Sequence, residues 1–195
     1  MDPIDHLLAR LAEVRAAQPD PGDIGAPNER ERVAERNGLL DRFRTSITAR
    51  RRRVEETAEK VVALKVELAR WAKVEARMEL ELTAAEERVA AMPNSVQGRE
   101  RRQVEGGVTA LAQQVAWARD GLPRDGGVIV SCEPFDSAFR ASFGVLPHES
   151  AAQPAPELRA RLDMLEPGLL TAQADLDREL ASLDQVLAEL AQQAA

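Results

Sequence analysis

Apolar residues recur every seven positions over about sixty residues, and this repeat constrains the fold more than any other feature of the chain. With only Glu75 interrupting, the first positions of the heptads are Val33, Leu40, Ile47, Val54, Val61, Leu68, Leu82 and Val89. The fourth positions add Phe43, Leu64, Trp71, Met78, Ala85 and Met92. A spacing of 3.5 residues is that of a coiled-coil seam. The sequence therefore predicts a helical arm of roughly 95 Å that begins near Asn28 and ends before Pro93.

Two later segments are predicted to pack back on this arm. Residues 95–119 carry apolar residues at spacings of three and four, and in residues 157–195 leucine recurs every seven positions despite a kink or break expected at Pro167. Residues 29–53 hold nine arginines and four acids, whereas residues 163–195 hold seven acids and one arginine. Opposite charges beside apolar seams favour pairing, so we predict an all-α, elongated antiparallel coiled-coil hairpin. A parallel homodimer through the arm is the alternative.

The segments are predicted in the following order: a short amphipathic helix at 1–18, a Pro/Gly linker at 19–28, the arm with the first return helix at 29–120, an irregular insert at 121–156, and the acidic C-terminal helix at 157–195. Asp2 and Pro3 suit the first turn of the N-terminal helix. Within the insert, the apolar run Val128-Ile129-Val130 is compatible with a short strand.

Composition narrows the expected environment and partners. Aromatic residues make up 3% of the chain, and the net charge is -7, which disfavours general binding to nucleic acid or to anionic membranes. The single cysteine, Cys132, excludes an internal disulfide. No apolar run reaches the roughly 18 residues of a membrane span, and the N-terminus is acidic where a signal peptide would be basic. We therefore expect a cytoplasmic protein.

The first candidate protein-binding site is a stripe of phenylalanines in the insert. Phe135, Phe139 and Phe143 lie four residues apart, so in a helix they share one face. Either they dock on the chain's own coil or they are received by a partner, because an aromatic patch left in water is unfavourable.

Two further candidates lie nearer the N-terminus. The first helix presents Ile4, Leu7, Leu8 and Leu11 on one face, which fits a helix-in-groove peptide or a helix folded back on the bundle. Arg50, Arg51, Arg52 and Arg53 form a possible polyanion contact. A solvated or internally paired face is the favoured interpretation of these arginines, because consecutive residues radiate around a helix and no aromatic residue is interleaved for base stacking.

Catalytic chemistry has little support in the sequence. The two histidines, His6 and His148, stand far from Cys132, and no phosphate-binding loop, dinucleotide fingerprint or metal-ligand spacing is present. We therefore expect no enzyme activity, no cofactor, no metal and no small-molecule ligand. The sequence favours a structural or adaptor protein that binds protein partners or, as a homodimer, a second copy of itself. The alternatives are a nucleic-acid-associated protein using residues 30–53, and a secretion-type chaperone or component of a helical machine.

Overall fold

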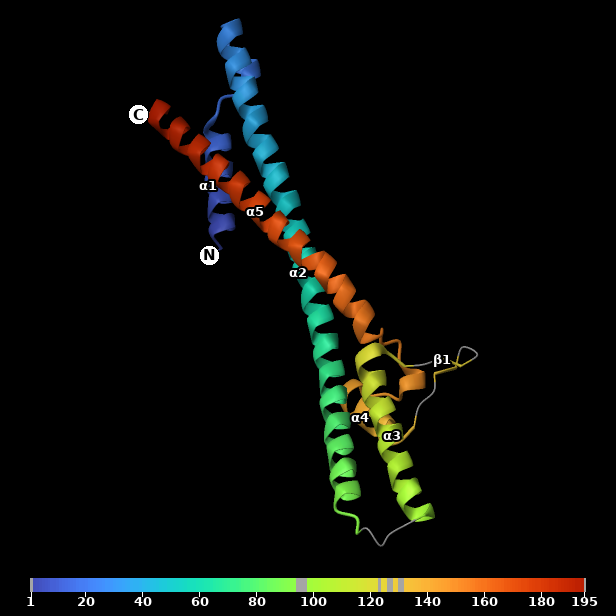
Figure 1. The fold of residues 1–195 in the computed structure, drawn as a ribbon. Helices are drawn as coiled ribbons and strands as arrows, with labels where there is room; N and C mark the ends of the chain where they lie inside the picture. Colours follow the sequence, from blue (N-terminus) through green and yellow to red (C-terminus); the bar gives the residue numbers. More distant parts are fainter. Residues whose placement is uncertain (1, 94–97, 123, 126–127, 130–131, 195) are drawn as a thin grey trace. The chain divides into compact units, whose positions relative to one another are not determined.

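The computed structural model describes residues 2–93, 98–122, 124–125, 128–129 and 132–194. The predicted all-α class is confirmed (Figure 1). Within the described residues the α-helices are α1 (Pro3–Ala17), α2 (Pro27–Ala90), α3 (Arg99–Asp120), α4 (Phe135–Phe143) and α5 (Ala155–Ala194). Two short 3₁₀ helices, η1 (Pro21–Asp23) and η2 (Pro147–Glu149), lie in the connections.

A minimal β-hairpin is the only strand pairing in the part of the chain that the structure describes. Strand β1 (Arg124–Asp125) pairs antiparallel with β2 (Val128–Ile129), and Arg124 lies opposite Ile129. The predicted strand therefore exists at its first two residues. Val130, its third, lies outside the described residues.

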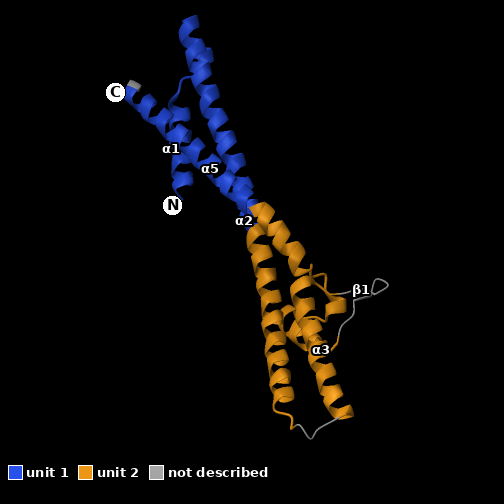
Figure 2. Cartoon of the chain, viewed as in Figure 1, with its two compact units in different colours: residues 1–59, 166–195 blue, residues 60–165 orange. Residues whose placement is uncertain are grey.

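The chain packs as two compact units (Figure 2). Unit 1 contains residues 1–59 and 166–195, and unit 2 contains residues 60–165. The long helix α2 and the C-terminal helix α5 are each divided between the two units, so that one segment of each helix belongs to unit 1 and the other to unit 2. Each unit has a hydrophobic core of its own.

Unit 1 is a bundle of α1, the first part of α2 and the last part of α5. Asp2 caps α1 by accepting a hydrogen bond from the Ile4 backbone N–H at 3.0 Å, and proline follows as the first helical residue, so the predicted start is confirmed. The buried core is formed by Leu11, Leu40, Ile47, Leu176, Leu183 and Leu187. One apolar face from each of three helices therefore supplies this core.

Ion pairs join the three helices of unit 1. Arg50 of α2 lies 3.7 Å from Asp175 and 3.8 Å from Glu179 of α5. The acidic α5 segment thus packs against the basic start of α2, as their opposite charges predict. Arg10 of α1 pairs with Asp184 of α5 at 3.0 Å.

Unit 2 is built on an antiparallel pair formed by α2 and α3. Arg119, near the end of α3, donates to Glu75 and Glu79 of α2 at 2.8 and 3.1 Å, so α3 runs back along α2. At the end of α3, Gly121 has φ of +106°, and a Cβ there would lie 3.0 Å from the Cβ of Pro154. Both the backbone conformation and the space therefore require glycine at this turn.

The buried seam of α2 differs from a strict heptad in two respects. Up to Val61 the buried residues are at first positions, such as Leu40 and Ile47, whereas from Leu64 onward the fourth positions Leu64, Trp71 and Met78 are buried. In unit 2 the residues packed on α2 come from α3, α4 and the start of α5, so a different side of α2 is covered than in unit 1. Val74 is fully buried in this core, while the neighbouring Glu75 pairs with Arg119 of α3.

Helix α5 continues through Pro167, where a kink or break was expected. A proline in a helix interior removes one backbone hydrogen bond. Pro167 and Gly168 are both exposed, so the unpaired carbonyl of the preceding turn lies toward water. Of the two outcomes predicted here, a kink or a break of the helix, the break does not occur.

Candidate interaction surfaces

The phenylalanine stripe lies inside the core of unit 2. Phe135 and Phe139 of α4 are 0% and 1% exposed. Phe139 stacks on Phe143 with ring centroids 4.3 Å apart and meets Trp71 of α2 edge-on at 5.4 Å. The sequence left open whether the phenylalanines dock on the chain's own coil or on a partner. In the structure they dock on the chain's own helices. Phe135 and Phe139 are consequently unavailable to a partner in this conformation.

Hydrogen bonds, one buried and one partly buried, hold the insert against α2 and α3. The side-chain oxygen of Gln114, on α3, accepts from the Phe135 backbone N–H at 3.1 Å, which satisfies one of the free donors at the start of α4. The indole N–H of Trp71 donates to the Gln153 carbonyl at 2.9 Å. Residues 132–153 are therefore an integral part of unit 2.

Phe143 is the one member of the stripe that lines a surface hollow. The hollow has a volume of about 460 Å³ and is also lined by Val66, which is 49% exposed. The guanidinium of Arg70 lies 6.0 Å from the centre of the Phe143 ring. A cation over an aromatic face is a favourable contact of about 0.5–1 kcal/mol at an exposed site. This hollow has a mixed lining, which also includes Glu67 and Ser150, and no feature that selects one occupant.

Helix α1 is folded back on unit 1. Of its four predicted anchors, Leu11 is 1% exposed, while Ile4, Leu7 and Leu8 are partly buried against the same core. Asp2 and Asp5 both form ion pairs with Arg51 of α2. The apolar face of α1 is therefore occupied within the chain.

The four consecutive arginines point to different surroundings. Arg50 pairs with α5, Arg51 with α1 and with Glu55, and the largely exposed Arg52 with Glu56 one turn ahead. The hydrogen bond to Asp5, followed by that to Glu55, raises the pKa of the Arg51 guanidinium. Arg53 is exposed. These side chains do not converge on one site.

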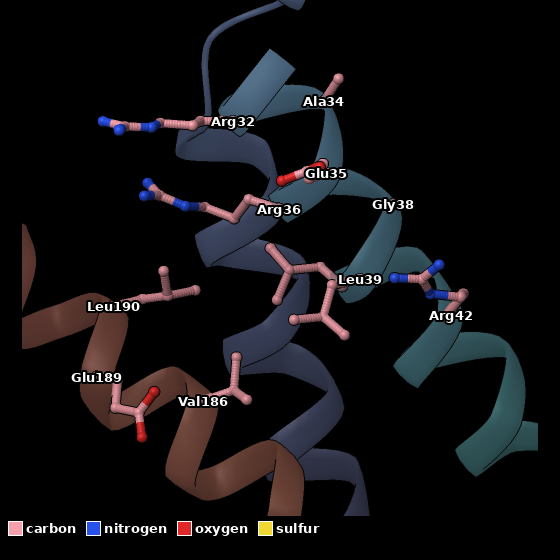
Figure 3. Close-up of a pocket in the computed structure, with 11 residues that line it drawn as sticks. Arg32, Ala34, Glu35, Arg36, Gly38, Leu39, Arg42, Val186, Glu189 and Leu190 are labelled. Atoms are coloured by element: carbon pink, nitrogen blue, oxygen red, sulfur yellow. The ribbon is translucent and has the colours of Figure 1, made fainter. Parts of the chain in front are cut away.

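A wider hollow lies between the start of α2 and the end of α5, within unit 1 (Figure 3). Its volume is about 890 Å³, and we call it the α2–α5 groove. The lining residues are basic (Arg32, Arg36, Arg42), apolar (Leu39, Leu40, Val186, Leu190), acidic (Glu35, Glu189) and small (Ala34, Gly38). Figure 3 shows Arg32 and Arg36 extending on the same side of α2, with Leu190 projecting toward them from α5.

The groove combines a half-buried apolar floor with an exposed basic edge. Leu39, Val186 and Leu190 are each only partly covered. Arg32 and Arg42 are exposed and form no ion pair with another described residue, whereas Arg36 donates to the Gln18 side chain at 3.3 Å. Gly38 adds no side chain, and nothing lies within 4 Å of the position its Cβ would occupy. The arrangement can receive an apolar side chain flanked by negative charge.

Asn37 is a buried polar residue beside this groove. It is 5% exposed, and neither of its side-chain polar atoms has a hydrogen-bond partner in the described structure. Its neighbours Arg36 and Asp41 contact Gln18 and Arg15, so the last turn of α1 crosses this stretch of α2. An unsatisfied buried amide costs about 1–3 kcal/mol. The sequence pattern did not place Asn37 in the core.

The reactive side chains of the chain are dispersed. Burial, followed by the nearby carboxylates of Asp136 and Glu133, raises the pKa of the Cys132 thiol. His6 and His148 are both exposed. Across the described ranges, no three His, Cys, Asp or Glu side chains are grouped in a way that could hold a metal ion. Nor does any helix in those ranges combine the length and the apolar character needed to cross a membrane.

Sequence reasoning missed the α2–α5 groove because it followed the heptad seam. Leu39 stands immediately before the seam residue Leu40, and an apolar residue just outside a seam widens the apolar face of the helix. Arg32 and Arg42 both line this groove and lie outside the consecutive run at 50–53. One signal in the sequence could have indicated the groove: Leu39 lies outside the seam, and Arg32 and Arg42 flank it at a distance of one to two helical turns.

Comparisons with known proteins give no match: neither a family model, nor a curated protein, nor a solved structure matches this chain.

Proposed function

We propose that this chain is a helical structural or adaptor protein that binds another protein through the α2–α5 groove. The observation that carries the proposal is the half-buried apolar floor of Leu39, Val186 and Leu190 beside exposed arginines. Partner helices are commonly received in such apolar grooves between helices. The role is binding within a larger assembly, without catalysis.

Nucleic-acid binding through residues 30–53 is less well supported. A phosphate backbone is bound by several unpaired cations, whereas Arg50, Arg51 and Arg52 each contact carboxylates of the chain itself. The groove also includes Glu35 and Glu189, whose carboxylates repel phosphate. We therefore favour a protein partner.

Site-specific photo-crosslinking tests the proposal. A photo-reactive amino acid placed at Glu189, which is exposed on the groove edge, is expected to trap one protein of defined mass in an extract of the source cells. The same residue placed at Arg52, whose side chain is 80% exposed, is the control and should trap none. Adding Leu39→Glu should abolish the adduct while far-UV circular dichroism stays unchanged. Equal trapping at both positions, or none at Glu189, would show that the groove is not the binding surface.

A further inference from the structure

We propose that the occupant of the α2–α5 groove is an acidic amphipathic helix of a partner protein; this inference rests on the proposed function. The basis is charge complementarity along α2. Three arginines but only two glutamates line the groove, and Arg32 and Arg42 form no ion pair with a described residue. An acidic helix would supply the carboxylates that these arginines lack.

The contact between α2 and α5 in the same unit illustrates the chemistry. Near the middle of unit 1, α5 offers Asp175 and Glu179 to Arg50, while Leu176 and Leu183 fill the apolar seam beside them. An acidic amphipathic helix therefore already packs on the basic side of α2. Residues 175–184 of α5 contain four acids.

Toward its C-terminal end, where α5 lines the groove, the helix carries few carboxylates. Residues 185–194 of α5 contain Glu189 as their single acid. The opposite stretch of α2 still carries Arg32, Arg36 and Arg42. Arg32 and Arg42 are ten residues apart, about 15 Å along the helix, which matches roughly three turns of an incoming helix. We infer that its apolar residues contact Leu39 and Leu190, and that Asp or Glu residues flank them.

A displayed peptide library provides the probe, with the full-length chain as the bait. The library consists of 15-residue helical peptides. Leucine is fixed at the first and fourth positions of each heptad of the peptide, and the remaining positions vary among Glu, Gln and Lys. Enriched peptides are expected to be acidic, and binding should weaken as salt is raised. No enrichment, or enrichment of neutral or basic peptides, would overturn the inference. Binding of duplex DNA at the same surface, with a steep salt dependence, would replace it with the nucleic-acid alternative.

Matched charge variants locate the contact. Arg32→Glu with Arg42→Glu should weaken the enriched peptides by at least about tenfold. Arg44→Glu with Arg52→Glu makes the same change of charge on exposed arginines that do not line the groove, and binding should stay within about twofold. If the double variant Arg32→Glu with Arg42→Glu has reduced helicity, Arg32→Gln with Arg42→Gln is used instead, because it removes the same two positive charges without introducing negative ones. Equal losses in both pairs would refute a specific site.

The two proposals fail separately. If crosslinking at Glu189 remains sensitive to Leu39→Glu but the library has no acidic bias, the groove binds a protein of other chemistry and only the inference is lost. If the crosslink also fails, the proposed function falls with it.

Discussion

Replacing Phe139 by alanine is expected to remove a large part of the stability of unit 2. The side chain is 1% exposed and contacts three rings, those of Trp71, Phe135 and Phe143. Truncating a buried phenylalanine to alanine costs about 3–5 kcal/mol, because apolar transfer and the remaining cavity both contribute. Domains are typically stable by about 5–15 kcal/mol, so Phe139→Ala should remove about a fifth of the total or more.

Tryptophan fluorescence gives an assay specific for unit 2. The chain has two tryptophans, Trp71 and Trp117, and both pack in or against the core of this unit. With a urea dependence of about 1–2 kcal/mol per molar, Phe139→Ala should lower the midpoint of the fluorescence transition by about 1.5–5 M. Phe43→Ala is the control, since Phe43 packs against the core of unit 1. A fluorescence midpoint lowered no more by Phe139→Ala than by Phe43→Ala would refute the placement of α4 in this core.

Three other changes have defined outcomes. Asn37→Leu removes an unsatisfied buried amide and should raise the free energy of unfolding of unit 1 by about 1–3 kcal/mol, measured by hydrogen exchange; unchanged protection would mean that the amide is satisfied. Gly38→Ala, in a helix interior with open space at its Cβ, should stabilise unit 1 by about 0.5–1 kcal/mol in the same measurement, and a loss would indicate a hidden contact. The pKa of the Cys132 thiol is raised in the folded chain, so ionisation favours unfolding. Stability should therefore fall as pH rises through the ordinary thiol pKa, a dependence that Cys132→Ser should remove in urea titrations.

Local signals in the sequence were sufficient for the longer helices. The proline and aspartate at the start of α1 and the prolines around α2 fix helix ends through backbone chemistry that needs no tertiary information. Helix α4 was not predicted, because residues 121–156 were expected to be an irregular insert; the four-residue spacing of the phenylalanines fits a helical face but does not establish a helix. The longer helices could therefore be predicted, and the short helix of the insert could not.

The sequence did not predict which sides of α2 are covered by the other helices. The core position of Asn37 and the open side of Leu39 depend on where α1 and α5 lie around α2, and a heptad count cannot specify which neighbour covers which flank. The burial of Val74 in place of Glu75 depends on where α3 and α4 pack on α2, which a heptad count does not specify. The candidate groove thus follows from the arrangement of three helices and was not predicted.

The division of α2 and α5 between the units has a consequence for biosynthesis. Unit 2 is continuous in sequence, from residue 60 to 165, whereas unit 1 needs residues 1–59 together with residues 166–195. A ribosome therefore releases every residue of unit 2 before the α5 segment that completes unit 1. Domains generally fold as units during translation, with the N-terminal one first. In this chain the N-terminal unit is the one completed last. Leu40 and Ile47 stay uncovered by α5 until more than a hundred later residues have left the ribosome.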